Sequence, residues 1–185
     1  MNDEPGICNY ALALVGANQI EDLDGASDEA VICNALYEPS RDGLLAEVDW
    51  SFATTRRSLA STGDTPAYEY DYEYQLPTDC FRVVETSNDD FYVVEGDKLL
   101  CDASSVTIKY IKRVTDVSKM PHLFKQALAF QMAVDMCEAL GGKNRGRMKS
   151  QLQDRFMYVM DQAFATDAAQ DNKDIPKEGS VINAR

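Results

Sequence analysis

Residues 68–74 carry the side chains of this chain whose spacing best suits chemistry, in the order Tyr-Glu-Tyr-Asp-Tyr-Glu-Tyr. On an extended strand, successive side chains point to opposite faces, so the carboxylates and the tyrosine rings would lie on opposite sides. Carboxylates about 6.5–9.5 Å apart have the spacing of an inverting glycosidase, and tyrosine rings could stack on sugars. One hypothesis is therefore a carbohydrate-binding or glycan-hydrolysing protein that uses Glu69, Asp71 and Glu73.

The alternative function for the same strand is an interface. Carboxylates on an exposed strand are usually solvated, and nothing in the sequence indicates that one of them holds a proton near neutral pH. A face of aromatic rings suits packing against a helical core or a neighbouring subunit. The candidate interface residues in this strand are Tyr68, Tyr70, Tyr72 and Tyr74.

Other patterns typical of catalysis or cofactor binding are missing from the sequence. His122 is the only histidine, and its place beside Pro121 near an expected helix start favours a capping or surface role. The segment 141–146 is rich in glycine, but it follows an expected helix and lacks the phosphate-loop pattern. The five cysteines are scattered and contain no C-x-x-C pair. We therefore expect no enzyme, no metal and no cofactor.

A second candidate interface is basic. Four cations fall within seven residues between two expected helices, and they are Lys143, Arg145, Arg147 and Lys149. Such a cluster could meet an acidic partner or a phosphate backbone. Its side chains could instead cap the carbonyl groups at the end of a helix. The sequence leaves both roles open.

The charge of the 185-residue chain is strongly negative and unevenly distributed. The net charge is −13, with 22 Asp and Glu against 5 Lys and Arg in residues 1–105, and 9 against 13 in residues 106–185. The broad basic face that grips nucleic acid is therefore not expected over most of the chain. No run of about 18 apolar residues exists, so we expect no membrane span. The length predicts one domain.

Helical patterns begin the chain. An apolar run at 7–15 is stopped by Gly16, a residue typical of helix C-caps. Ser27, followed by two acidic residues, predicts the N-cap of a longer helix that Pro39 would kink or divide. Trp50, which follows this helix, is expected to anchor the core together with Phe52.

Period-two patterns between residues 68 and 113 predict a small antiparallel sheet, and helical periodicity returns at about 123–140 and 145–166. We therefore expect an α+β fold, in which a bundle of about four main helices has an inserted small antiparallel β-region and an extended C-terminal tail. The last two helices should pair antiparallel. The expected parts are the N-terminal helices at 1–66, the β-region at 67–114, the C-terminal helical hairpin at 115–166 and the tail at 167–185.

Five segments follow one another in a distinctive order and spacing. They are residues 7–17 (ICNYALALVGA), 20–23 (IEDL), 48–53 (VDWSFA), 74–83 (YQLPTDCFRV) and 110–116 (YIKRVTD). In this order they resemble the tail tubular protein A family, the head-to-tail connectors or adaptors of short-tailed bacteriophages. The segments carry no chemistry of their own, and the resemblance extends over roughly residues 7–165.

The resemblance implies a virion protein that is made in the host cytoplasm and assembles as a homo-oligomeric ring, a dodecamer in our expectation. The ring would join the portal protein to the tail nozzle protein, and DNA would pass through it during packaging and ejection without specific binding. An acidic channel would repel the phosphates of the duplex. Residues 167–185 could become ordered against the portal on assembly.

Overall fold

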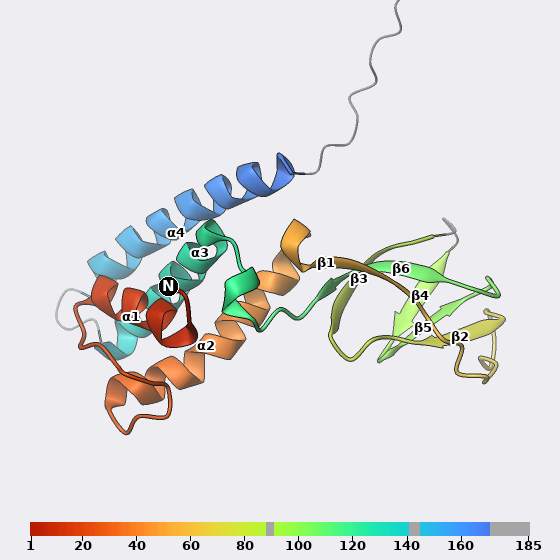
Figure 1. The fold of residues 1–185 in the computed structure, drawn as a ribbon, viewed down its shortest axis with the longest axis horizontal. Helices are drawn as coiled ribbons and strands as arrows, with labels where there is room; N and C mark the ends of the chain where they lie inside the picture. The colour runs from red at the N-terminus through yellow and green to blue at the C-terminus, as the bar shows by residue number, and fades with distance from the viewer. Residues whose placement is uncertain (88–90, 141–144, 171–185) are drawn as a thin grey trace, which may run out of the picture.

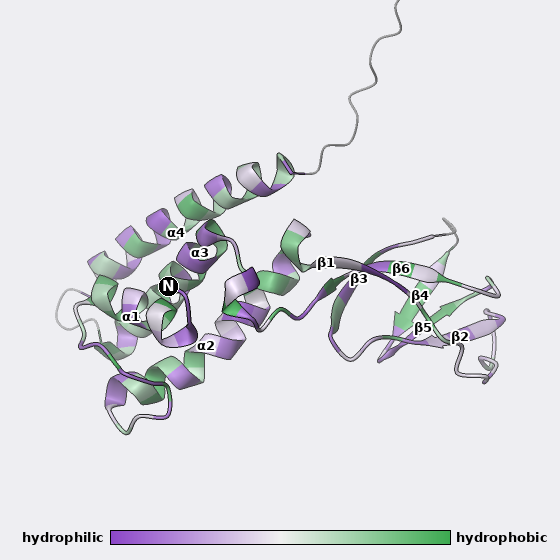
Figure 2. Cartoon of the chain, in the orientation of Figure 1, coloured by the Kyte–Doolittle hydropathy of each residue, from purple (hydrophilic) through white to green (hydrophobic). Residues whose placement is uncertain are grey.

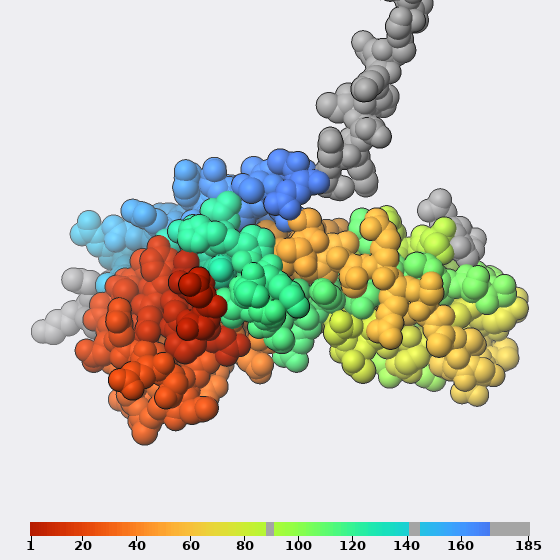
Figure 3. All heavy atoms as spheres, viewed as in Figure 1, coloured from red at the N-terminus to blue at the C-terminus, as the bar shows by residue number. Residues whose placement is uncertain are grey.

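The computed structural model describes residues 1–87, 91–140 and 145–170 of the chain. Helices form a bundle at one end and two small antiparallel sheets form the other end, so the α+β fold expected from the sequence is confirmed (Figure 1). The space-filling view shows the helical part and the β part as two adjoining lobes (Figure 3). Because the N-terminal and C-terminal helices share one bundle, the β-region is an insertion into a helical frame.

The central element of the bundle is α3. Helix α1 spans Glu4–Val15, α2 spans Asp28–Glu47, α3 spans His122–Leu140 and α4 spans Arg145–Ala168. α3 packs against the other three helices and buries side chains on all sides, as a fully enclosed helix does. Hydrophilic and hydrophobic residues alternate along α4, which lies over α3 and runs antiparallel to it as expected (Figures 1 and 2). The bundle core therefore forms around α3.

Side-chain caps define the ends of α1. Asp3 accepts a hydrogen bond from the Gly6 N–H at 2.9 Å, and Gly16 ends the helix in the left-handed conformation at φ 74°. The prediction that Gly16 is the C-cap is confirmed. Beyond the cap, the Asn9 side chain bonds both the N–H and the C=O of Ile20, at 2.8 and 2.9 Å. These two bonds fix the loop that leads to α2.

Gly16→Ala is expected to lower the free energy of unfolding by about 1 kcal/mol, because an L side chain is strained at positive φ. No atom lies within 4 Å of the position that a Cβ would take, so the effect isolates the backbone. Gly43→Ala is the matched control, because Gly43 lies inside α2 with equally open space. Its expected effect has the opposite sign, a gain of roughly 0.5–1 kcal/mol in urea unfolding. A loss of stability in both variants would contradict the conclusion that the left-handed backbone at Gly16 causes the effect.

Helix α2 is continuous through Pro39. The Ser27 side chain caps its N-terminus by accepting from the Ala30 N–H at 3.2 Å, as predicted. Division of the helix at Pro39, one of the two outcomes expected, does not occur. Pro39 is exposed, so the carbonyl group that loses its helical partner there can be hydrated by solvent.

The β-region consists of two three-stranded antiparallel sheets. The strands are β1 (Thr54–Ser58), β2 (Tyr72–Gln75), β3 (Cys80–Thr86), β4 (Tyr92–Glu95), β5 (Lys98–Cys101) and β6 (Thr107–Lys112). Sheet A has the order β1-β6-β3, and sheet B has the order β2-β5-β4. The sheets share a second apolar core that is separate from that of the bundle, with Leu99 and Ile108 fully buried in it.

Two expected boundaries need correction. The β-region begins at β1, ahead of residue 67, because β1 pairs over its whole length with β6. Its sequence, Thr-Thr-Arg-Arg-Ser, lacks the alternation of apolar residues that marks a half-buried strand, so its partner in space decides its conformation. Asp167 and Ala168 belong to α4 and not to a tail, and a turn follows at residues 169–170. Residues 171–185 of that expected tail lie outside the described residues.

None of the helices in the part of the chain that the structure describes has the length and apolar character needed to cross a membrane.

Candidate functional site

The tyrosine run at 68–74 is not one continuous strand. Glu69 adopts a positive φ of 72°, and the Tyr70 N–H bonds the Tyr68 carbonyl at 3.0 Å, so the chain turns there. Only Tyr72 and the residues after it enter β2. The expected wall of four rings backed by three carboxylates is therefore wrong. Strict alternation in the sequence could not reveal this turn, because the residue in the left-handed conformation is a glutamate and not glycine or asparagine.

The four tyrosines have different environments. Tyr74 is 1% exposed, and its hydroxyl group donates to the Ala103 carbonyl at 2.7 Å, so it is a core residue and not an interface residue. Burial raises the pKa of Tyr74. Tyr70 is half-buried. Tyr68 and Tyr72 are 74% and 37% exposed and could contact another molecule.

Glu73 is committed to an ion pair within sheet B. Its Oε1 lies 2.7 Å from Nζ of Lys98 on β5, and only 9% of the residue is exposed. The hydrogen bond from Lys98 lowers the pKa of Glu73, and the same contact raises the pKa of Lys98. A glycosidase acid needs a raised pKa, so the shift at Glu73 has the wrong sign for that role.

The basic cluster divides into engaged and free side chains. Arg145 Nη1 donates to the Glu138 carbonyl at the end of α3 at 3.1 Å, and Lys149 Nζ lies 2.8 Å from Glu138 Oε1. Lys149 lowers the pKa of Glu138. Both cations thus stabilise the C-terminal end of α3, one of the two roles left open by the sequence. Lys143 lies outside the described residues. Arg147 is exposed and makes no ion pair with any residue that the structure describes.

Sheet A carries a basic surface that the sequence analysis did not identify. Arg56 of β1 lies opposite Lys109 of β6, and Lys109 lies opposite Glu85 of β3. Arg56 and Arg57 are exposed, whereas Lys109 lies 3.7 Å from Glu85 and is 18% exposed. The adjacent arginines at 56 and 57 were the available signal. They were overlooked because residues 1–105 as a whole are strongly acidic.

A cleft of about 750 Å³ separates sheet A from the C-terminal end of α4. Ser51 closes one side of it by donating its N–H and its hydroxyl group to the two carboxylate oxygens of Asp167, at 2.9 and 2.6 Å. Arg56 and Lys109 line the opposite side. The cleft therefore has charged walls of both signs. This arrangement suits polar contacts between elements more than the apolar enclosure of a small-molecule site.

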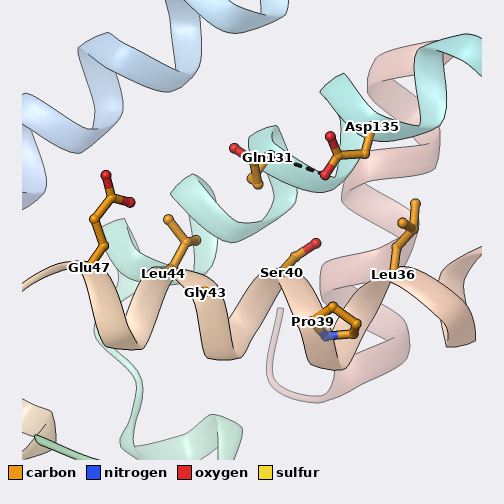
Figure 4. A pocket seen from close by; sticks show the side chains of 8 residues that line it. All are labelled: Leu36, Pro39, Ser40, Gly43, Leu44, Glu47, Gln131 and Asp135. Atoms are coloured by element: carbon orange, nitrogen blue, oxygen red, sulfur yellow. Dashed lines mark hydrogen bonds between the residues drawn. The ribbon is translucent and has the colours of Figure 1, made fainter. Parts of the chain in front are cut away.

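A second hollow, of about 490 Å³, lies between α2 and α3 (Figure 4). Carbon atoms of Leu36, Pro39 and Leu44 line it, and Glu47 and Asp135 stand at its rim. The carboxylate of Asp135 accepts a bond from Gln131 at 3.0 Å (Figure 4). Ser40 lines the hollow without a histidine partner. The hollow therefore lacks a nucleophile and base pair.

The remaining candidates for chemistry are dispersed over the described residues. Within them, no three His, Cys, Asp or Glu side chains are grouped closely enough to hold a metal ion. His122 is exposed and begins α3, which agrees with the surface role expected from the sequence. Four of the five cysteine side chains are buried. The candidate functional features are therefore surfaces and not a catalytic constellation.

Neither the protein-family models nor the curated proteins compared with this chain match it. The fold defines an α+β protein with a helical bundle and an inserted two-sheet region, of which sheet A carries exposed arginines.

Proposed function

We propose that this chain is a non-enzymatic head-to-tail connector of a short-tailed bacteriophage. Copies of the chain form a ring in the virion between the portal protein and the tail nozzle protein, with a channel for DNA. The proposal combines the resemblance of five segments to the tail tubular protein A family with a candidate site that consists of surfaces. Such a protein acts through self-association and docking and has no turnover.

The observation that carries the proposal is that these segments bond to one another in space. The first and second segments meet through Asn9 and Ile20, which exchange two hydrogen bonds. The third and fourth meet through the ion pair of Asp49 with Arg82. Asp49 is the last residue before the aromatic anchor Trp50, so this ion pair joins the bundle to β3.

The fourth and fifth segments meet through Asp79. Its carbonyl group accepts from the Arg113 N–H at 2.7 Å, and its carboxylate accepts from the Tyr110 hydroxyl group at 3.2 Å. The residues that carry the resemblance thus lie at the joints of the fold. Segments that together hold one fold should occur together and in a fixed order. Their contacts therefore support the interpretation that the five segments are one family pattern and not five coincidences.

Arg147→Glu is expected to weaken ring assembly or portal binding by roughly tenfold or more. Among the basic residues of this cluster that the structure describes, Arg147 is the one whose side chain does not bond to Glu138 at the end of α3. Arg145 and Lys149 are poorer choices, since each stabilises the end of α3. Arg155→Glu is the matched control, with the same charge change on another exposed position of α4. Sedimentation and capture on immobilised portal rings would measure both variants. Equal behaviour of the two would refute a specific role for Arg147.

Negative-stain electron microscopy of the purified chain mixed with portal rings tests the proposed function directly. The expected result is a second ring stacked coaxially on the portal. Particles that contain the portal alone, together with a chain that stays monomeric at every concentration, would overturn the connector proposal.

A further inference from the structure

The two sheets of the β-region have four edge strands, and three of these edges are protected. The edge of β2 is covered by the preceding segment, since the Thr62 N–H bonds the Glu73 carbonyl at 3.0 Å and the Gln75 N–H bonds the Ala60 carbonyl at 3.3 Å. The edge of β3 is interrupted by two register shifts against β6. Covering and bulging are two ways in which proteins prevent sheet edges from pairing with other chains.

The edge of β1 is protected by charge. Arg56 and Arg57 occupy two of its five positions and are exposed. Charged side chains on an edge disfavour pairing with an apolar strand or with an identical basic strand. They still permit pairing with a strand that lies in acidic surroundings.

Among the residues that the structure describes, nothing protects the edge of β4 in these ways. Its sequence is Tyr-Val-Val-Glu, its register with β5 is regular, and Val93 and Val94 are 38% and 44% exposed. Phe91, just before the strand, is 93% exposed. A regular apolar edge of this kind is a template for an added strand.

The hairpin turn fixes which backbone groups of β4 are free. Glu95 and Lys98 face each other across a two-residue turn that begins with Gly96 at φ 62°, so they form the hydrogen-bonded pair that closes the hairpin. Hydrogen-bonded and non-hydrogen-bonded pairs alternate along an antiparallel ladder. Val94 therefore belongs to a non-hydrogen-bonded pair with Leu99, and its N–H and C=O point away from β5 toward the open edge.

The surroundings of the two edges have opposite charge. Besides Arg56 and Arg57, sheet A carries Arg82, Lys109 and Lys112 against Glu85. The segments 61–76 and 91–106, which contain sheet B, carry Lys98 as their base and the carboxylates Asp64, Glu69, Asp71, Glu73, Glu95, Asp97 and Asp102. Like edges of two copies therefore repel, and unlike edges attract.

We propose that the edge of β4 in one copy pairs with the edge of β1 in the next copy, so that a continuous line of intermolecular strand pairs runs around the ring. This inference rests on the proposed ring and names the surfaces that build it. The contact joins unlike patches, which is the heterologous type that a closed ring requires. The apolar side chains of β4 supply contact area, while the arginines of β1 select the acidic sheet of the neighbour.

Val94→Pro removes the outward N–H of β4 and leaves the ladder with β5 complete, since proline is tolerated on an edge strand when its nitrogen faces solvent. We expect self-association to weaken by roughly tenfold or more in sedimentation, as loss of an intermolecular hydrogen bond predicts. Val94→Thr is the matched control, because it keeps the N–H and the β-branched shape, and it should assemble normally. Arg56→Glu combined with Arg57→Glu tests the opposite edge without any change in β4.

Mixing the two blocked proteins gives the most specific outcome. The Val94→Pro chain retains a good β1 edge, and the double arginine variant retains a good β4 edge. At a concentration where the wild type assembles and each blocked protein alone stays monomeric, the mixture should give a complex of two chains that grows no further. If the Val94→Pro chain forms rings as the wild type does, or if the mixture stays monomeric, the edge pairing is overturned. The connector proposal would still stand. A wild-type chain that forms no ring, even with portal, would overturn the connector proposal itself.

Discussion

Trp50→Ala is expected to lower the free energy of unfolding by roughly 3–5 kcal/mol, the range for removing a large aromatic side chain from a core. Trp50 is 1% exposed, and its ring centroid lies 5.2 Å from Phe124, 5.5 Å from Phe164 and 5.9 Å from Phe52. Its Nε1–H also donates to the Leu44 carbonyl at 2.7 Å. The side chain thus joins α2, α3, α4 and the segment that leads into β1.

Chemical denaturation followed by circular dichroism measures this effect. Trp50→Phe separates the contribution of ring packing from that of the hydrogen bond, because phenylalanine keeps most of the packing and leaves the Leu44 carbonyl without its donor. We expect its stability to lie between that of the wild type and that of Trp50→Ala. Tyr158→Ala is the control for removing an aromatic ring at a 65% exposed position, where the change should stay within about 0.5 kcal/mol. A loss for Trp50→Ala no larger than that of Tyr158→Ala would refute its role as the anchor.

Asp42→Asn is expected to destabilise the chain by about 3 kcal/mol, the lower end of the range for breaking a buried ion pair. The side chain of Arg41 is 1% exposed, and its Nε donates to Asp42 Oδ1 at 2.8 Å. Its other carboxylate contact, Glu38, lies at 3.4 Å on a 65% exposed side chain. Loss of the Asp42 charge therefore leaves a buried cation poorly compensated.

Asp42 has a second role that makes the variant more damaging. Its Oδ2 pairs with Arg113, which follows β6, so one carboxylate joins α2 to the β-region. The Asp42 contact raises the pKa of Arg113. We therefore expect the variant to loosen the junction between the two lobes as well as α2 itself.

A double-mutant cycle tests the buried ion pair. Arg41→Met combined with Asp42→Asn removes both charges, so that no buried cation is left without its carboxylate. We expect the double variant to be more stable than Asp42→Asn alone. Urea unfolding measures the loss of stability in each variant. If the loss in the double variant equals the sum of the losses in the two single variants, Arg41 does not depend on Asp42.

Expectations that rest on local chemistry agree with the structure. Gly16 and Ser27 cap helices where the sequence placed them, because a glycine in the left-handed conformation and a hydroxyl group at an N-terminus act within one turn of backbone. Trp50 is buried because an aromatic ring in a chain of this size gains more from the core than from solvent. Such predictions depend on residue types and on residues that are close in the sequence.

Expectations that needed distant partners were incomplete. The sequence does not predict strand β1, because its residues lack the alternation of apolar and polar side chains. Its conformation depends on the pairing with β6. Tyr74 and Tyr68 belong to one repeated pattern, yet one is buried and the other is 74% exposed, because the turn at Glu69 redirects the chain. For Arg145 and Lys149 the sequence left open a contact with a partner or a capping role at a helix end, and the end of α3 engages both.

The sequence by itself determined the α+β class, the helix caps, the aromatic anchor and the overall charge asymmetry. These properties follow from residue type and local spacing. Only the tertiary structure decided which tyrosines and cations remain exposed, that the strands form two sheets of opposite charge, and that β4 keeps an open edge. The physical reason is that exposure, ion pairing and edge protection depend on groups far apart in the chain, whose proximity the packing of the helices and sheets creates.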